Sequence, residues 1–307
     1  MLLIENIVKQ FKKKNSVVTA IDNVNLKINN GEIICILGHN GAGKTTLMKC
    51  IGGLITPTSG SIMLNSKDII KDKSIPKKSV GAVLEGSRNI YYYLSAKDNL
   101  KYFGLLNNLS NEVIKSRTDK YLKLFDLTDR QNDAVKEFSR GMQQKVAIMV
   151  ALMKDPDILL LDEPTLGLDI PSSNVVKNII EELAINSKKT IIITTHDISL
   201  IEGLNSRVVF MKKGKIIKDD KLENLKNFIQ EDNSYEIVLK SDDIKKITNN
   251  NKCEVINIED NIATVKTKDL SWLSESLNKN EVISINKVKT EFDFIYNEIV
   301  GDVNNDK

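Results

Sequence analysis

The chain contains the run Gly38-His39-Asn40-Gly41-Ala42-Gly43-Lys44-Thr45-Thr46, which follows an apolar segment at 32–37 and precedes another at 47–51. The first segment has the length and β-branched content of a buried strand, and the second reads as the start of a helix. Glycines in such a loop let consecutive backbone N–H groups point into one concavity, and the positive end of the following helix adds to their field. The pattern predicts a phosphate-binding loop for a nucleoside triphosphate, in which Lys44 reaches the β- and γ-phosphates and the Thr45 hydroxyl holds Mg²⁺. A chance glycine-rich turn is the alternative.

Strands and helices alternate along the chain on either side of this loop. The expected strands span 80–84, 158–163 and 190–196, and the expected helices span 95–131, 142–153 and 172–185. Continuous apolar strands that alternate with helices predict a parallel sheet with helices on both faces. Residues 1–30 alternate instead in the manner of antiparallel strands, and 208–217 reads as a closing hairpin.

The composition narrows the class of protein. The 307 residues carry a formal net charge of +3, and only 5% are aromatic, so neither a basic field nor stacking platforms favour nucleic acid as a partner. The three cysteines form no C-x-x-C motif, and Cys35 and Cys50 are expected to be core thiols of a cytosolic protein. No stretch approaches the roughly 20 apolar residues of a membrane-spanning helix, and the N-terminus lacks the layout of a signal peptide. A role at a membrane would therefore require a partner that spans it.

Two strand ends carry side chains suited to phosphate chemistry. Asp162 and Glu163 follow four apolar residues, at the edge of an α/β sheet where ligands bind. We expect Asp162 to hold Mg²⁺ and Glu163 to deprotonate the attacking water. His196 ends another strand, where it can donate a hydrogen bond to the γ-phosphate. An acidic strand end without function and a structural histidine are the alternatives.

A third motif lies between the phosphate loop and the acidic strand, and it reads Phe138-Ser139-Arg140-Gly141-Met142-Gln143-Gln144. It is similar to the signature sequence of ATP-binding cassette (ABC) proteins, usually Leu-Ser-Gly-Gly-Gln. The order of motifs continues with Leu166-Gly167-Leu168-Asp169 as the D-loop and His196 as the switch histidine. Residues 1–225 thus resemble the ATP-binding subunit of an ABC transporter.

The resemblance implies a fold and a mode of action. It implies an α/β phosphate-loop ABC ATPase domain at 1–225, with a mostly parallel core sheet, an antiparallel β subdomain and a helical subdomain at about 88–155. It also implies a homodimer, or a heterodimer with a related ATPase, that binds ATP between its two copies. Hydrolysis then powers transport through a separate integral-membrane permease, which would hold the chain at the cytoplasmic face of the membrane.

The resemblance also implies roles for individual residues. Phe11 would stack on adenine, and Val17 or Val18 in its place would mean that this loop is misaligned. Asp169 would cross the dimer interface. The residues facing the ATP of the opposite copy would be Ser139, Arg140, Gly141 and Met142, and the Mg²⁺ ligands would be Thr45, Glu85 and Asp162.

The chain departs from the family pattern in two places. Arg140 and Met142 replace a glycine and the glutamine of the signature, and such forms resemble those of exporter subunits paired with a separate permease. The tail of the chain resembles the small C-terminal domain of some drug- and antibiotic-export ATPases. Glu85 stands where the family usually has glutamine. A carboxylate offers oxygen to Mg²⁺ but has no N–H to donate, so we expect Glu85 to ligate the metal and couple it to the permease; neutral drift is the alternative. Residues 85–94 would line the permease groove, with Tyr91-Tyr92-Tyr93 as amphipathic anchors or, alternatively, as core residues.

Beyond about residue 230 the composition shifts towards Asn, Lys and Asp. Strands are expected at 235–240, 254–258, 262–266 and 281–285, and helices at 242–247, 270–277 and 292–299. The order β-α-β-β-α-β fits a split βαβ sandwich. We therefore expect 230–307 to form a small α+β accessory domain, ferredoxin-like, that resembles the C-terminal domain of some export ATPases and serves docking or regulation.

Two rival functions stay open at this point. A soluble ABC ATPase acting on ribosomes or DNA usually carries two cassettes or a long coiled-coil insertion, and this sequence shows neither. A regulator that binds nucleotide without hydrolysing it is the second rival, and the presence of both Glu163 and His196 argues against it.

Overall fold

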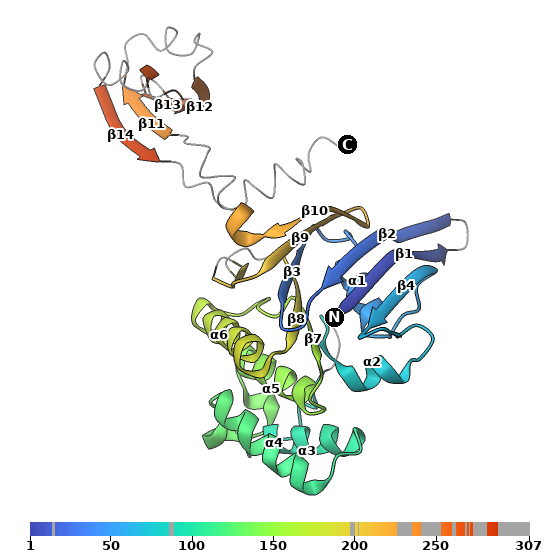
Figure 1. Cartoon of the computed structure of the whole chain (residues 1–307). Helices are drawn as coiled ribbons and strands as arrows, with labels where there is room; N and C mark the ends of the chain where they lie inside the picture. Colours follow the sequence, from blue (N-terminus) through green and yellow to red (C-terminus); the bar gives the residue numbers. More distant parts are fainter. Residues whose placement is uncertain are drawn as a thin grey trace. The chain divides into compact units, whose positions relative to one another are not determined.

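The computed structural model describes residues 1–13, 16–85, 89–196, 200–201, 203–225, 235–240, 253–259, 262–267, 269, 271–272 and 281–287. The chain divides into two compact units, Met1–Leu222 and Glu223–Lys307 (Figure 1). No helix among the described residues is both long enough and apolar enough to span a membrane.

The first unit is built on a six-stranded sheet of order β10-β9-β3-β8-β7-β6. Its strands are β3 (Ile33–Leu37), β6 (Val80–Val83), β7 (Ile158–Asp162), β8 (Thr190–Thr195), β9 (Arg207–Lys212) and β10 (Lys215–Lys221). All neighbours pair in parallel except β9 and β10, which form the expected antiparallel hairpin. Every residue of β3, β7 and β8 is buried, as a sheet covered on both faces requires. The predicted mostly parallel core is confirmed.

The strands of this sheet alternate between two packed faces. On one face, Ile34, Ile36 and Leu160 join a core cluster with helix α1 (Lys44–Ile51). Because side chains alternate along a strand, Cys35 and Leu159 point to the other face. Helices α5 (Arg140–Leu152) and α6 (Ile170–Ser187) pack against the same sheet. Cys35 and Cys50 are buried as predicted, and burial raises the pKa of the Cys50 thiol to about 11.

A second sheet is antiparallel and has the order β2-β1-β4-β5. Its strands are β1 (Leu2–Lys13), β2 (Ser16–Ile28), β4 (Ser59–Leu64) and β5 (Lys67–Asp68). Strand β1 pairs with both β2 and β4, and their apolar residues enter the cluster that contains α1. The expected antiparallel subdomain is therefore present, and it packs on the helix that follows the phosphate loop.

The helical region differs from the prediction in its boundaries. It comprises α3 (Ala96–Leu106), α4 (Asn111–Leu124), the 3₁₀ turns η1 (Thr128–Arg130) and η2 (Val135–Glu137), and α5, whereas α2 (Ser74–Ser79) contacts β6. The single helical pattern expected over 95–131 is wrong: the chain turns at Asn108, whose φ is +57°, and Ser110 then caps a new helix. The cap at Ser95 is confirmed, since its Oγ accepts a hydrogen bond from the Asp98 N–H at 3.0 Å.

Helices α5 and α6 each begin two residues before the predicted start. In both, the residue before the helix caps it. Ser139 Oγ accepts from the Met142 N–H at 3.3 Å, and Asp169 Oδ1 accepts from the Ser172 N–H at 3.1 Å. A side chain that satisfies a free N–H fixes the first turn, so these motif residues themselves set the helix ends.

The second unit contains β11 (Tyr235–Lys240), β12 (Cys253–Glu259), β13 (Ile262–Thr267) and β14 (Glu281–Lys287) in the order β12-β13-β11-β14. All neighbours are antiparallel. The connections from β11 to β12 and from β13 to β14 each pass one intervening strand of the sheet, as in a split βαβ sandwich. Of the helices expected here, 242–247 and 292–299 lie outside the described residues, and 270–277 is described only at 271–272, which are helical. Trp272 packs there on Ile237, Leu239 and Val265.

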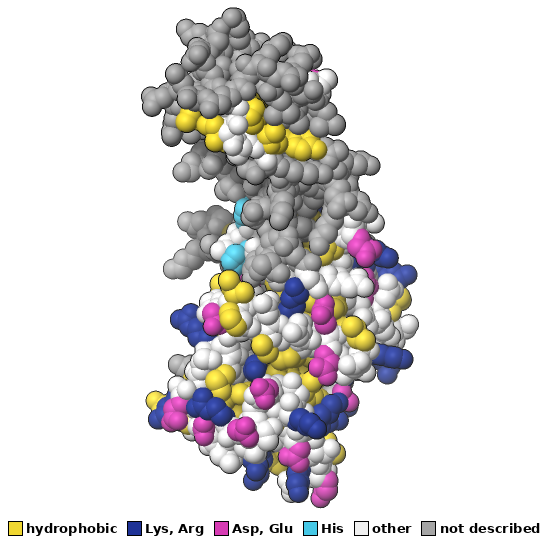
Figure 2. Space-filling view, turned by 90° about the vertical axis from the view of Figure 1, so that its left-hand side faces the viewer, with side chains coloured by type: hydrophobic (Ala, Val, Ile, Leu, Met, Phe, Trp, Pro, Cys, Tyr) yellow, Lys and Arg dark blue, Asp and Glu magenta, His cyan; other side chains and the backbone are white. Residues whose placement is uncertain are grey.

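On the face of the first unit shown in Figure 2, basic and acidic side chains are interspersed. This pattern agrees with the small net charge of +3. A surface of mixed sign does not produce the extended positive field that attracts a nucleic-acid backbone.

The burial of β7 predicts how a core substitution affects stability. Leu160→Ala should reduce the free energy of unfolding of the first unit by about 2–5 kcal/mol, because it removes fully buried methyl groups and leaves a cavity. Leu106→Ala is the matched control, since 64% of Leu106 is exposed, and it should change the same quantity by less than about 0.5 kcal/mol. Urea unfolding followed by circular dichroism measures both. Equal losses in the two variants would contradict the placement of β7.

Candidate active site

The phosphate loop connects β3 to α1 and depends on its glycines. Gly41 and Gly43 have φ angles of +84° and +105°, which residues with a side chain rarely adopt. A Cβ on Gly43 would lie 2.4 Å from the Ala20 carbonyl oxygen, and one on Gly38 would lie 2.4 Å from that of Met211. The loop is thus held tightly between β2 and β9, and only glycine fits at these two positions.

The Lys44 ammonium lies inside the concavity of this loop. Its Nζ donates to the Gly38 carbonyl at 2.5 Å and lies 4.0 Å from Glu163 Oε1. Burial lowers the pKa of Lys44, while the nearby Glu163, Asp162 and Glu85 carboxylates act in the opposite direction. The loop therefore presents a buried amine to an anion, as phosphate binding requires.

Asp162 ends β7 beside the hydroxyl of Thr45. Its Oδ1 accepts hydrogen bonds from Thr45 Oγ1 at 3.2 Å and from the Thr194 hydroxyl. Its Oδ2 is buried and has no hydrogen-bond partner among the described residues. An unpaired buried carboxylate oxygen is costly, and hard cations such as Mg²⁺ prefer oxygen ligands. The pair Asp162–Thr45 therefore fits the predicted metal.

Glu85 follows β6 and lines the same pocket as Asp162. Within the described part of the chain, no group of three or more His, Cys, Asp or Glu side chains comes together as a metal site. A magnesium ion here would accordingly draw its other oxygens from the Thr45 hydroxyl, the nucleotide phosphates and water, which is its usual manner of binding.

Glu163 and His196 meet at the ends of neighbouring strands. His196 Nδ1 lies 2.9 Å from Glu163 Oε2, and the backbone N–H of His196 donates to the same oxygen at 3.4 Å. The Glu163 carboxylate is only 7% exposed. Its backbone has a φ of +51°, in the left-handed region, and is held there by a 2.9 Å hydrogen bond from its N–H to the Thr194 carbonyl. Strain of this kind persists where the surroundings fix one conformation, so the carboxylate has a set orientation.

Thr194 is a functional residue that the sequence analysis missed. Its hydroxyl binds Asp162 and its carbonyl holds the backbone of Glu163. The one available signal is its position two residues before His196, directly after three consecutive isoleucines. Thr194 thus positions both predicted carboxylates from a single point on β8.

The signature residues lie at the N-terminus of α5. Ser139 caps this helix, Ser139 and Arg140 are exposed, and Gly141 is buried. A Cβ on Gly141 would lie 2.7 Å from Ser172 Oγ on α6. The Met142 sulfur lies 3.8 Å from Arg130 Nη1. A 13-residue helix with an exposed N-terminus and no acidic residue in its first turn is suited to bind an anion.

The other predicted residues occupy separate elements. Phe11 lies on β1 opposite Val18, its side chain is 38% exposed, and the Lys9 ammonium lies 5.1 Å from its ring centroid. Asp169 caps α6, and the hydrogen bonds from Ser172 lower its pKa. His39 lies on the phosphate loop, where its carbonyl is 3.4 Å from Lys44 Nζ. The structure thus gathers Lys44, Thr45, Asp162, Glu163 and His196, and places the signature, Phe11 and Asp169 around them on other elements.

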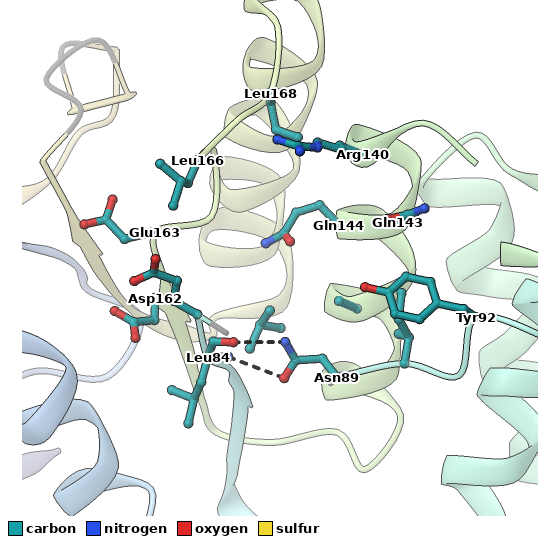
Figure 3. A pocket seen from close by; sticks show the side chains of 14 residues that line it. Leu84, Asn89, Tyr92, Arg140, Gln143, Gln144, Asp162, Glu163, Leu166 and Leu168 are labelled. Carbon is teal, nitrogen blue, oxygen red and sulfur yellow. Dashed lines mark hydrogen bonds between the residues drawn. The ribbon is translucent and has the colours of Figure 1, made fainter. Parts of the chain in front are cut away.

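A pocket of about 410 Å³ connects the acidic strand end with the signature helix (Figure 3). Asp162, Glu163 and Glu85 line it from the sheet, and Gln144 and Tyr92 line it from the helical region. The walls also include Asn89, which donates to the Leu84 carbonyl at 3.1 Å and so fixes the end of β6. The pocket is therefore a polar space shared by the catalytic carboxylates and the helical region.

Comparison with known proteins agrees with this geometry. A family model described as ABC transporter matches residues 21–166. The ABC transporter ATP-binding protein NatA of Bacillus subtilis is 40% identical over 225 residues, covering 73% of this chain and 91% of NatA. The glucose import ATP-binding protein GlcV of Saccharolobus solfataricus is 34% identical over 229 residues, covering 73% of this chain and 64% of GlcV.

The solved structures to which this chain is similar include ABC proteins as well. The dimeric ATP-binding cassette MJ0796, in a post-hydrolysis state bound to ADP and Pi, is similar with a TM-score of 0.66 and 29% identity over 72% of this chain and 99% of that chain. The protein cbiO1 from Clostridium perfringens, part of the ABC transporter complex cbiONQ, is similar with a TM-score of 0.65 and 27% identity over 75% and 94%. With a phosphate loop, an acidic strand end and a signature helix arranged on this fold, the chain belongs to the ATP-binding subunits of ABC transporters and is an ATPase of that family.

Proposed function

We propose that two copies of this subunit bind ATP between them and that its hydrolysis powers export through a separate permease. The observation that carries the proposal is the Glu163–His196 pair beside the phosphate loop, with a 2.9 Å contact and a nearly buried carboxylate. The dimeric state of the similar cassette MJ0796, bound to ADP and Pi, supports the pairing of copies. ATP that favours the paired state over the free one would drive closure, and hydrolysis would reverse it.

The geometry supports a distinct task for each group. Loop N–H groups and Lys44 hold the phosphates, and Phe11 stacks on the adenine. Thr45, Asp162 and Glu85 would hold Mg²⁺, which offsets phosphate charge when bound. Glu163 accepts the proton of the attacking water, and His196 keeps that carboxylate in place and faces the γ-phosphate. The helix end at 139–142 contacts the γ-phosphate held by the opposite copy, where Asp169 also crosses.

The observations favour this function over its two rivals. The face shown in Figure 2 carries charges of mixed sign, and the net charge of the chain is only +3, which favours neither ribosomal nor other nucleic acid as a partner. A regulator that only binds nucleotide has no use for a strained, oriented carboxylate at the loop, and such strain is typical of catalytic sites.

The direction of transport is inferred from the signature. GlcV is named an import protein, so the family as a whole does not decide the direction. The Ser-Arg-Gly-Met form at 139–142 favours an exporter, with drugs or antibiotics as the substrate class. The chain would then lie at the cytoplasmic face of the membrane, held by its permease, with residues 230–307 as a ferredoxin-like accessory domain for docking or regulation.

The proposed permease groove includes exposed tyrosines after Glu85. Tyr93 is 85% exposed, while Tyr91 packs edge-on against Tyr102 with ring centroids 4.9 Å apart. Tyr91 therefore supports the local fold, and Tyr93, whose ring centroid lies 5.4 Å from Lys136 Nζ, is the exposed amphipathic anchor.

Glu163→Gln should trap the dimer. Without the base, ATPase activity should fall about a hundredfold or more, while ATP still binds and holds two copies together. Size-exclusion chromatography with ATP should show a stable dimer of this variant. Glu182→Gln on the exposed side of α6 is the control and should neither trap a dimer nor lose activity. A Glu163→Gln variant that stays a single copy at saturating ATP, alone and with its permease, would refute the proposed dimer.

Glu85→Gln should preserve ATP hydrolysis. Both side chains offer an oxygen to Mg²⁺, and the amide only adds N–H donors. The steady-state rate should therefore change by less than about threefold. Release of phosphate measures this rate, and a complete loss of activity would contradict the proposal that glutamate and glutamine are interchangeable as the metal ligand at position 85.

Tyr93→Ala should weaken the complex with the permease. Loss of an aromatic anchor at an interface commonly reduces affinity by about ten- to thirtyfold. Co-purification with the permease from membranes measures the effect, and ATPase activity of the isolated variant should be unchanged. Tyr102→Phe, which keeps the ring, is the control. Undiminished co-purification of Tyr93→Ala would place the groove elsewhere.

A further inference from the structure

Arg140 makes an unusual contact within its own chain. Its guanidinium lies against the backbone of Gly167 in the D-loop: a Cβ built on Gly167 would be 2.6 Å from Arg140 Nη1 and 3.8 Å from Cζ. Gly167 also has a φ of +73°. Figure 3 shows Arg140 reaching from the start of α5 towards Leu168. The missing side chain at 167 is what lets the planar group lie on the D-loop.

The charge of Arg140 does not explain its position. Arg140 is the first residue of α5, where the positive helix end disfavours a cation. The first turn of α5 holds no acidic residue, and in the described part of the chain no carboxylate pairs with Arg140. The contact that it does make is with the D-loop at Gly167, which the guanidinium approaches with Nη1 foremost.

A second junction lies one residue further along. Gly141 packs on Ser172 so closely that a Cβ would be 2.7 Å from the hydroxyl oxygen, and Ser172 donates its N–H to the Asp169 cap. The D-loop begins three residues after Glu163, and the Leu166 N–H donates a hydrogen bond to the Glu163 carbonyl at 3.2 Å. The signature end of α5, the D-loop and the catalytic glutamate therefore form one connected chain of contacts.

We propose that Arg140 is a positioning residue that fixes the D-loop against the signature helix of the same copy. This role rests on the proposed function, because it links the helix end that meets one ATP to the loop that approaches the other. Binding of a nucleotide phosphate at Ser139 would then affect the positions of Asp169 and Glu163 through these contacts, and not through the sheet. The D-loop is held ready before the second copy arrives.

The first test uses the nucleotide-free protein, so that it does not depend on dimer formation. Hydrogen exchange of a peptide spanning 163–170 should become about three- to tenfold faster in Arg140→Ala, since the guanidinium no longer covers the D-loop. Arg140→Lys should show the same increase, because a compact, strongly hydrated ammonium does not replace the fork of the guanidinium. Lys115→Gln, which removes an exposed charge on α4, should show none. The melting temperature of Arg140→Ala should not fall, because alanine favours the helix and the unfavourable charge at its start is gone.

The second test measures the consequence for the assembly. In the Glu163→Gln background, Arg140→Ala should raise the ATP concentration for half-maximal dimer formation about three- to tenfold, because the D-loop must now be ordered on closure. Unchanged exchange at 163–170, or exchange restored to normal by lysine, would overturn the positioning role of the guanidinium; the second result would instead assign the effect to the positive charge alone. If Glu163→Gln alone never dimerises while exchange responds as predicted, the proposed function fails and the Arg140 contact stands.

Discussion

The site depends on the parallel pairing of β3, β8 and β7. Their registers pair Leu37 with Thr195 and Thr194 with Asp162, so the three strands end at one edge. Parallel strands require long crossover connections, and here these connections carry the other motifs. Because the strands are buried along their whole length, a slip in register would expose apolar residues. The same burial that stabilises the sheet therefore fixes the spacing between the phosphate loop, the carboxylates and His196.

Several unfavourable features are concentrated at this edge. Glu163 adopts a left-handed backbone conformation, Asp162 has an oxygen without a partner, and Lys44 has a buried amine. Each would destabilise an isolated loop, and each is offset only while the surrounding strands stay packed. All three would be relieved or used by a triphosphate with its cation: the amine gains phosphate oxygens and the free carboxylate oxygen gains a donor or metal. Ligand binding and local stability are thus linked at the same residues.

Much of this arrangement could be predicted because it is local in sequence. The phosphate loop, the acidic strand end and the caps at Ser95, Ser139 and Asp169 are written in short motifs whose residues touch one another. The two-residue errors at the starts of α5 and α6 arose because the capping side chains were taken only as motif residues. The break at Asn108 is not evident from the apolar pattern, because the apolar residues of α3 and α4 follow the same helical period on both sides of it. The Thr194–Asp162 and Arg140–Gly167 contacts each join segments about 30 residues apart. The spacing of apolar residues along the chain cannot predict such contacts.

The two helix ends that are suited to bind anions lie apart in the subunit. The phosphate loop lies at the start of α1, whereas Ser139 lies at the start of α5, on the far side of the pocket that holds Glu163 and Gln144. A helix end is effective for an anion only within its first turn, so the signature end gains nothing from a phosphate at a distance. The exposed Ser139 cap and the close Gly141 contact at this helix end are explained if the phosphate belongs to an ATP molecule held by a second copy. The Arg140 contact then has a clear role, since it joins the end that senses that phosphate to the loop beside this copy's own catalytic carboxylate.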